Sequence, residues 1–254
     1  MSAASPVRIV TFAEQPMTPA LETLVSDLIS SAWKPIALID NASNPLWDRL
    51  YTDFAAFQFQ GYDESDRLIL VGNSIPVFWD QPFENLPDAG WDWAIVSGFE
   101  SYESGTPPTV LSALSVTIAP DQQGTGLSRV AILQMKAIAA AHGLKALIAP
   151  VRPNSKPQYA LTPMEHYITW TREDGAPFDP WLRTHWRLGA QIVKVCPQSM
   201  RAEYSVAEFE EEIGMRFPES GAYLAPGGLN PLQVDREADT AVYVEPNVWV
   251  VHPV

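Results

Sequence analysis

Hydrophobic residues in this chain follow two spacings, which together predict a mixed fold of helices and strands. Apolar residues three or four positions apart predict helices over residues 19–33, 46–57, 128–142, 180–188 and 206–213. Short apolar runs bounded by turn residues predict strands over residues 7–12, 67–71, 77–79, 91–99, 109–119, 144–151, 191–195 and 241–251. Strands and helices therefore alternate along most of the chain.

Turn residues suggest how some of these strands pair. The runs 67–71 and 77–79 are expected to form a hairpin across the turn signal at Gly72. The strands 91–99 and 109–119 are expected to form a second antiparallel pair, because the residues between them are rich in turn formers.

Two helix boundaries carry recognisable signals. Asn44 before Pro45 fits an N-cap and first helical position for the helix at 46–57. Gly143 fits the residue that follows the end of the helix at 128–142. The helix at 128–142 is the clearest in the sequence, because it is rich in alanine, leucine, isoleucine and methionine.

The chain shows no internal repeat, low-complexity tract or long linker, so we expect one domain over residues 1–254. Residues 150–180 are dense in proline and carry aromatic side chains among the prolines. This composition predicts an ordered but irregular segment. We interpret it as an insertion in the domain at about residues 152–180.

Charge narrows the choice of partner. The chain holds 30 acidic and 16 basic residues, a formal net charge of −14. A phosphate backbone is bound through clustered lysine and arginine, so this balance excludes nucleic acid as the expected partner. It also suits a cationic acceptor such as an amine, although acidity for solubility alone is the more ordinary explanation.

Cysteine and histidine add little chemistry of their own. The single cysteine, Cys196, excludes an internal disulfide, and the first residues lack the features of a secretory signal. No run reaches the ~20 apolar residues needed to cross a bilayer, so we expect a cytoplasmic protein.

The histidines of the chain are His142, His166, His185 and His252. They are widely scattered and lack the spacing of metal ligands on one element, so we predict no metal.

The segment most informative about chemistry is 111–154, predicted as strand, glycine-containing turn, helix and strand. Such a turn leaves backbone N–H groups unpaired at the positive end of a helix dipole, which suits a phosphate. Glycine lets a phosphate approach the backbone where a Cβ would block it. Gly124 and Gly126 fit this role.

This turn resembles the pyrophosphate loop of the GNAT superfamily of N-acetyltransferases. The family pattern is glutamine or arginine, two residues, glycine, one residue, then glycine or alanine, and Gln123, Gly126 and Ser128 hold the specified positions. Ser128 departs from the pattern, but it is small and its hydroxyl is able to bond a phosphate. The resemblance implies an α+β fold with a mixed, strongly twisted sheet flanked by helices, and acetyl-CoA or another acyl-CoA as cosubstrate. It also implies that the pyrophosphate is bound by Gln123, Gly124, Thr125, Gly126, Leu127 and Ser128.

Two rival phosphate motifs fail at specified residues. A dinucleotide fingerprint counted from Gly124 needs a third glycine where this chain has Arg129. A P-loop needs glycine, lysine and then serine or threonine, which this turn lacks. A turn that binds nothing remains the alternative.

The resemblance also implies a path for the rest of the coenzyme. In the family the strand after the helix splays from its neighbour, and the pantetheine arm lies in the gap. Backbone N–H groups near Val116 and Ile118 would then polarise the thioester carbonyl. Asn154 stands where the family often has an asparagine after this strand, with a plain turn asparagine as the alternative.

The proton donor is the main departure from the family. A later helix there ends with a tyrosine that protonates the departing CoA thiolate. This chain matches in Leu188 and Gly189 but has His185 at the position of the tyrosine. Histidine is able to do the same job, so His185 is our candidate general acid, with Tyr159 and Tyr167 as alternatives.

A base is also needed, because an amine must lose a proton before it attacks a thioester. Glu100 is our candidate, and Glu103, Glu165 and His166 are the alternatives. None of them is distinguished by spacing. The three tryptophans Trp170, Trp181 and Trp186 either line a pocket or fill the core.

From the resemblance we expect acyl-CoA-dependent N-acyl transfer, most simply of acetyl, to an amine of a small molecule or peptide by direct attack in a ternary complex. The alternative is a non-catalytic acyl-CoA-binding or regulatory protein, which the His185 departure motivates. A homodimer through the last strand stays open.

Overall fold

The computed structural model describes residues 7–43 and 45–254. Its strands are β1 (Arg8–Thr11), β2 (Phe59–Tyr62), β3 (Leu68–Val77), β4 (Val110–Ile118), β5 (Ala146–Val151), β6 (Gln191–Tyr204), β7 (Gly221–Tyr223), β8 (Leu232–Asp235) and β9 (Thr240–Pro253). Its helices are α1 (Pro19–Ala32), α2 (Leu50–Asp53), α3 (Gly90–Ser104), α4 (Leu127–Ala141), α5 (Met164–Tyr167), α6 (Pro180–Arg187) and α7 (Val206–Ile213).

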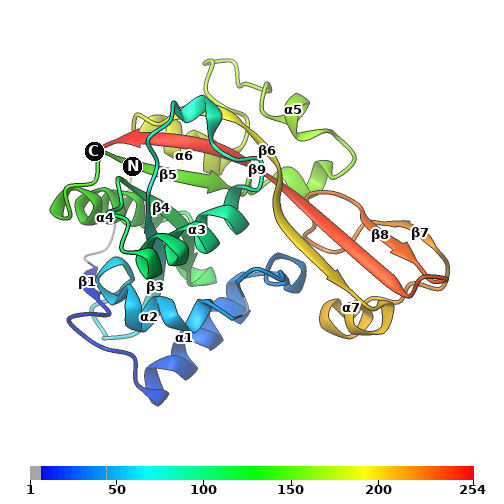
Figure 1. Cartoon of the computed structure of the whole chain (residues 1–254), viewed down its shortest axis with the longest axis horizontal. Helices are drawn as coiled ribbons and strands as arrows, with labels where there is room; N and C mark the ends of the chain where they lie inside the picture. The colour runs from blue at the N-terminus through cyan, green and yellow to red at the C-terminus, as the bar shows by residue number, and fades with distance from the viewer. Residues whose placement is uncertain (1–6, 44) are drawn as a thin grey trace.

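All of these strands belong to one mixed sheet, in the order β1-β2-β3-β4-β5-β9-β8-β7, with β6 also paired to β9. Strands β1 to β4 are antiparallel, β4 and β5 are parallel, and β9 returns antiparallel to β5. The long antiparallel strands β6 and β9 lie side by side and extend from the part of the sheet next to β5 to α7, β7 and β8, where β6 ends and β9 begins (Figure 1). The predicted α+β fold with a mixed, twisted sheet is confirmed.

Strands β4 and β5 separate after a short parallel contact. They pair at Leu111 with Leu147 and at Ser112 with Ile148, although β4 continues to Ile118. Leu114 is an extra residue in β4 opposite β3, which marks a β-bulge beside the separation. The gap between the two strands is therefore part of the fold, as the sequence comparison with the GNAT pattern predicted.

Helices cover both faces of the sheet. The apolar faces of α1 and α4 share one core with β2 and β3, and they include Leu21, Val25 and Ile132. Helix α3 packs on the opposite face against β3, β4 and β9. A separate small core around Phe209 joins α7 to the far ends of β6 and β9. The gap between β4 and β5 thus opens within a firmly packed body.

The predicted strand at 91–99 is wrong, because this segment forms helix α3. Tryptophan, isoleucine, valine and phenylalanine favoured a strand by composition. The buried residues of the helix are Gly90, Trp91, Ala94, Ile95, Gly98 and Phe99, and their spacing is helical. The predicted antiparallel pair of 91–99 with 109–119 is wrong with it, and β4 pairs with β3 instead.

The predicted hairpin over 67–79 is also wrong, because β3 is a single strand from Leu68 to Val77. Gly72 does not turn the chain. A Cβ built on Gly72 would lie 2.1 Å from the Phe59 ring of the neighbouring strand, so glycine is needed there for close packing. Asn73 is equally buried and donates to the Tyr51 hydroxyl at 3.0 Å.

The predicted helix at 46–57 is broken into short pieces. A 3₁₀ turn at Trp47–Arg49, helix α2 and a 3₁₀ turn at Ala55–Phe57 follow one another, and Phe54 interrupts them with φ −124° and ψ 29°. The proposed N-cap Asn44 lies outside the described residues. Strands β2, β7 and β8 and the short helix α5 had no predicted counterpart, and β6 is longer than the expected 191–195.

The remaining elements match their predictions to within a few residues at the ends. Helix α7 has the expected bounds, and a capping box between Ser205 and Glu208 starts it. Helix α4 begins at Leu127 and ends before Gly143, whose φ is +69°. No helix in the described part of the chain is long and apolar enough to cross a membrane.

Candidate active site

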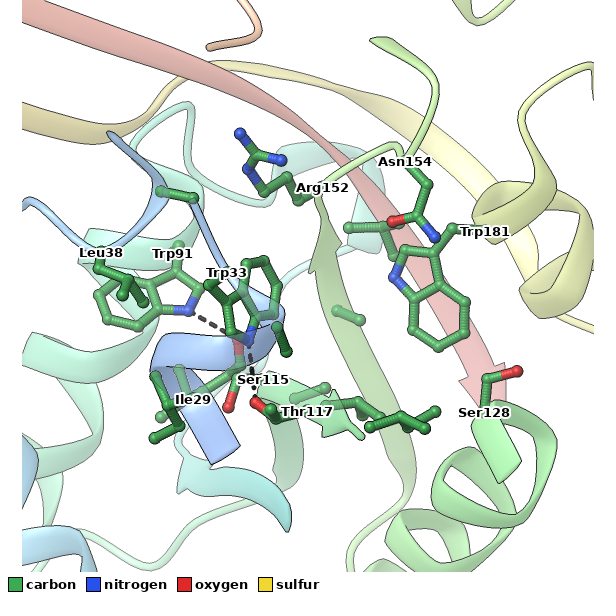
Figure 2. A pocket seen from close by; sticks show the side chains of 18 of the residues that line it. Ile29, Trp33, Leu38, Trp91, Ser115, Thr117, Ser128, Arg152, Asn154 and Trp181 are labelled. Atoms are coloured by element: carbon green, nitrogen blue, oxygen red, sulfur yellow. Dashed lines mark hydrogen bonds between the residues drawn. The ribbon is translucent and has the colours of Figure 1, made fainter. Parts of the chain in front are cut away.

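A cleft of about 1320 Å³ opens where β4 and β5 separate. Its walls come from α1, β4, the loop before α4, the end of β5 and α6. Figure 2 shows Ser128 at one end, Trp181 and Asn154 facing the middle, and Trp33, Trp91 and Arg152 around the other end. The cleft therefore joins the predicted phosphate loop to a second, tryptophan-lined compartment, which we call the acceptor end.

The loop before α4 has the geometry of a phosphate site. Gly124 has φ +78° and Gly126 has φ +95°, conformations that residues with a Cβ rarely adopt. Gly126 caps α4 without a side-chain bond. Among the described residues, no atom accepts a hydrogen bond from the N–H groups of residues 124–128, so these groups are free for an anion.

The rest of this loop is held by local contacts. The Thr125 hydroxyl donates to the carbonyl of Gln122 at 2.7 Å. Leu127 is buried in the core, whereas Gln123 is exposed and Ser128 lies at the rim of the cleft. Four of the six predicted loop residues, Gln123, Gly124, Leu127 and Ser128, therefore line one end of the cleft, and Thr125 and Gly126 lie between them in the same loop.

The edge of β4 that faces the gap carries free N–H groups. The N–H of Ala119 donates to Ile69 of β3 at 2.9 Å, so alternate residues of β4 face β3. By the same alternation the N–H groups of Val116 and Ile118 face the gap, beyond the last contact with β5. Both residues line the cleft, where an amide or thioester carbonyl would find these donors.

Asn154 and Trp181 border the middle of the cleft from opposite elements. Asn154 is exposed, follows β5, and has no hydrogen-bond partner among the described residues (Figure 2). Trp181 stands in the first turn of α6, which Asp179 caps by accepting from the Trp181 and Leu182 N–H groups. Of the three tryptophans singled out in the sequence, Trp181 is the one at the cleft.

The acceptor end is walled by aromatic rings. The Trp33 indole donates to the Thr117 hydroxyl at 2.9 Å, and the Trp91 indole donates to the Leu114 carbonyl at 2.8 Å (Figure 2). The Trp47 and Trp91 rings are stacked with centroids 6.0 Å apart. These bonds fix the indole faces that a cation is able to contact.

Charged side chains are few at the acceptor end. Asp40 is 3% exposed and accepts from the backbone N–H and hydroxyl of Ser43. Asp48 is exposed at the rim. Arg152 follows β5, and it binds both carboxylate oxygens of the buried Glu245 at 2.8 and 3.0 Å. Lys34, beside Trp33, also lines the cleft. Because Glu245 balances Arg152, the two carboxylates of Asp40 and Asp48 exceed the one cation of Lys34, and this end of the cleft is negative.

Behind this wall lies a carboxyl that the sequence did not point to. Asp92 is in the first turn of α3, and one of its oxygens accepts from the Arg201 N–H at 2.9 Å. Its other oxygen is buried and has no partner among the described residues. Burial, together with Asp40 and Glu245 nearby, raises the pKa of Asp92 to about 7.

His185, the predicted general acid, lies in α6 at the border of the cleft but is only 3% exposed. Its Nδ1 lies 2.9 Å from Nε2 of His252, and its ring packs against Trp181. Burial, with His252 beside it, holds the pKa of His185 well below its ordinary value. The ring is therefore neutral at pH 7, which does not favour donation to a thiolate, and the role stays a prediction.

Because both buried histidines have lowered pKa values, we predict that the protein loses stability in acid. Burial, with Lys136 nearby, lowers the pKa of His252 to about 4, so this histidine is protonated near pH 6.5 in the unfolded chain but stays neutral in the folded protein. Unfolding free energy should fall by about 1 kcal/mol per histidine between pH 7.5 and 5.5. His185→Gln should lose less over this interval, as measured by urea denaturation at both values. An equal loss would contradict this explanation.

Glu100, the predicted base, lies on the exposed face of α3 and does not line the cleft. Glu100 was chosen because a strand at 91–99 would have put it at the edge of the sheet. The segment forms helix α3 instead, and the helix turns Glu100 to the surface. Glu103 pairs with Arg49 on the surface. Tyr167 donates to Asp179 inside the 152–180 segment, where Tyr159 packs beside it. Glu100 as the base stays a prediction that its position does not favour.

Comparison with known proteins agrees with this geometry. No family model matches the chain. A curated relative, arginine N-acetyltransferase avaD of Aspergillus versicolor, is 33% identical over 254 aligned residues, which cover 89% of this chain and 87% of the relative. Since that relative is an acetyltransferase, an enzyme is favoured over a non-catalytic binding protein.

Solved structures show the same fold. The loading GNATL domain of CurA from Lyngbya majuscula matches with a TM-score of 0.64 at 18% identity, covering 98% of each chain. The GNAT-like decarboxylase GphF, solved with isobutyryl-CoA, matches with a TM-score of 0.54 at 15% identity over 97% of this chain and 98% of the other. At these identities the likeness concerns the fold alone. Together with the curated relative, it shows that this chain belongs to the GNAT superfamily and is an N-acetyltransferase.

Proposed function

We propose that this N-acetyltransferase takes acetyl-CoA as donor and a cationic, arginine-type small molecule as acceptor. The observation that carries the proposal is the acceptor end of the cleft, where tryptophan rings meet the carboxylates of Asp40 and Asp48. Aromatic faces and carboxylates are the groups that bind a guanidinium or ammonium ion. The name of the curated relative, an arginine N-acetyltransferase, supports the same class of acceptor.

The coenzyme would lie along the cleft from the α4 loop to the β4 bulge. The free N–H groups of residues 124–128 would bind the pyrophosphate, with Gln123 and Ser128 at its sides. The pantetheine arm would follow the gap past Asn154, and the N–H groups of Val116 and Ile118 would bond its amide and the thioester carbonyl. This path ends beside Trp33 and Trp91, at the acceptor end.

Transfer would then proceed by direct attack. The acceptor nitrogen loses a proton and forms a bond to the thioester carbon, and the carbon–sulfur bond breaks as the thiolate leaves and takes up a proton. Tyr51 lines the cleft, and burial raises the pKa of its hydroxyl to about 12, so the phenol is protonated at neutral pH. We propose Tyr51 as a second candidate, alternative to His185, for the donor to the thiolate.

The charge of the acceptor can be tested with a matched pair of substrates. Arginine and citrulline have nearly the same shape, but citrulline lacks the positive charge. With acetyl-CoA saturating, kcat/KM for arginine should exceed that for citrulline by at least about tenfold, since the carboxylates favour the cation. Release of CoA measures the rate, and lysine serves as a cation of different shape. Equal rates for arginine and citrulline would refute the proposed acceptor class.

A further inference from the structure

Arg152 occupies a position in the cleft that the acyl-transfer chemistry does not explain. It directly follows Val151, the last residue of β5, and its side chain lies over the acceptor end (Figure 2). The side chain is 18% exposed. It is the arginine among the described residues that line the cleft.

Its guanidinium is held in one orientation. Nε and Nη2 bind the two oxygens of Glu245 at 2.8 and 3.0 Å, and Nη2 also donates to the carbonyl of Gly227 at 2.6 Å. Glu245 is 1% exposed and is fixed in turn by the hydroxyl of Tyr243 at 2.7 Å. A buried pair of this kind contributes little net stability, because desolvation offsets its attraction. Its rigid geometry is the feature that needs explaining.

One nitrogen of this guanidinium remains free. The Tyr243 hydroxyl also interacts with the guanidinium, but no hydrogen bond is seen from Nη1 among the described residues. Nη1 is not one of their buried unpaired atoms, so it is accessible on a side chain that lines the cleft. An arginine fixed by two of its nitrogens and open at the third is arranged to bind an oxygen of a ligand.

The charged residues near Arg152 indicate what kind of ligand carries that oxygen. Glu245 already balances Arg152, and Asp40 and Asp48 together outweigh the single positive charge of Lys34 at the same end of the cleft. A strong anion alone would be repelled, so the ligand must carry its own cation, as an arginine-type acceptor does. Such a molecule has a carboxyl or amide carbon bonded to the same α-carbon as its α-nitrogen.

We propose that Nη1 of Arg152 binds the α-carboxyl oxygen of the acceptor, as free acid or as amide, and so orients its cationic end toward Asp40 and Asp48. This inference rests on the proposed arginine-type acceptor. Arg152 is then a residue that binds substrate and sets specificity, and Glu245 positions it.

The test combines three acceptors with one conservative variant. L-Arginine, L-argininamide and agmatine share the cationic chain, but agmatine lacks the carboxyl carbon. Wild-type protein should show kcat/KM at least about tenfold higher for arginine, for argininamide or for both than for agmatine. Arg152→Lys keeps the positive charge beside Glu245 but lacks the planar guanidinium and its free nitrogen. In this variant the preference should disappear, while kcat/KM for agmatine should stay within twofold of wild type. A higher rate for arginine than for the amide identifies a carboxylate, and the reverse identifies a neutral carbonyl.

Controls separate this role from folding and from the acceptor class. Arg201→Lys, in an exposed pair with Glu203, should leave all three acceptors unchanged. Calorimetric binding of acetyl-CoA should be equal in both variants and wild type. If agmatine matches arginine in wild type, or if Arg152→Lys slows all three acceptors alike, the inference is overturned while the acceptor class stands. If no arginine-type acceptor reacts or binds, both fall together.

Discussion

Replacing Gly126 by valine is expected to weaken acetyl-CoA binding by at least about 100-fold. Gly126 has φ +95°, and a β-branched residue in that conformation is strained by about 1–3 kcal/mol. The new side chain would also stand among the free N–H groups of residues 124–128, where the pyrophosphate must approach. Both effects act on the same few atoms, so the loss should appear in Kd measured by calorimetry.

The matched control is Gly143→Val at the other end of the same helix. Gly143 has φ +69° and open space around its Cα, so valine there carries a similar backbone strain without facing the cleft. Its thermal unfolding should shift about as much as that of Gly126→Val, whereas its affinity for acetyl-CoA should stay near wild type. Binding by Gly126→Val within threefold of wild type would show that this loop does not hold the coenzyme.

This loop was predictable because its signal is local. Gln123, Gly126 and the start of α4 lie within a few residues, and the glycine requirement follows from backbone geometry at single positions. The splay of β4 from β5 was also expected, although only through the family resemblance. Nothing in the periodicity of either strand shows where their hydrogen bonds stop.

The acceptor end was not predictable, because it is assembled from distant parts of the chain. Arg152 meets Glu245 across 93 positions, and Trp33 reaches Thr117 across 84. No local pattern marks such partners. One signal was available, since Arg152 is a charged residue directly after a buried strand and two positions before Asn154. Charge at a strand end beside a predicted gap was reason to include it.

Composition misled the prediction where packing decides the structure. In α3 the residues Trp91, Ile95 and Phe99 favour strands by type, but they repeat every four positions and face one core. In β3 the turn-forming type of Gly72 was outweighed by the ring of Phe59 above it. In both segments the tertiary contact overrode the local preference.

The same packing places a carboxyl where it costs stability. Asp92 has Asp40 and Glu245 as charged neighbours, and the nearby arginines bind elsewhere, Arg201 to Glu203 and Arg152 to Glu245. Its raised pKa of about 7, against 3.8 unperturbed, means that the folded protein holds a proton that the unfolded chain releases. Stability should therefore fall as pH rises from about 4 to 7, and stay lower above pH 7.

Asp92→Asn is expected to remove this dependence. The amide oxygen is still able to accept from the Arg201 N–H, and no charge forms on ionisation. A shift of this size corresponds to a ceiling of about 4 kcal/mol, and partial exposure reduces the expected gain to about 2 kcal/mol at pH 8.5. At pH 4.5 the variant and wild type should differ little. Urea denaturation at both pH values measures the difference.

Asp88→Asn supplies the control, because Asp88 is an exposed partner of Lys194 on the loop just before α3. Its stability relative to wild type should not change with pH by more than a few tenths of a kcal/mol. An Asp92→Asn gain that is equal at both pH values would show that the carboxyl is not protonated in the folded state.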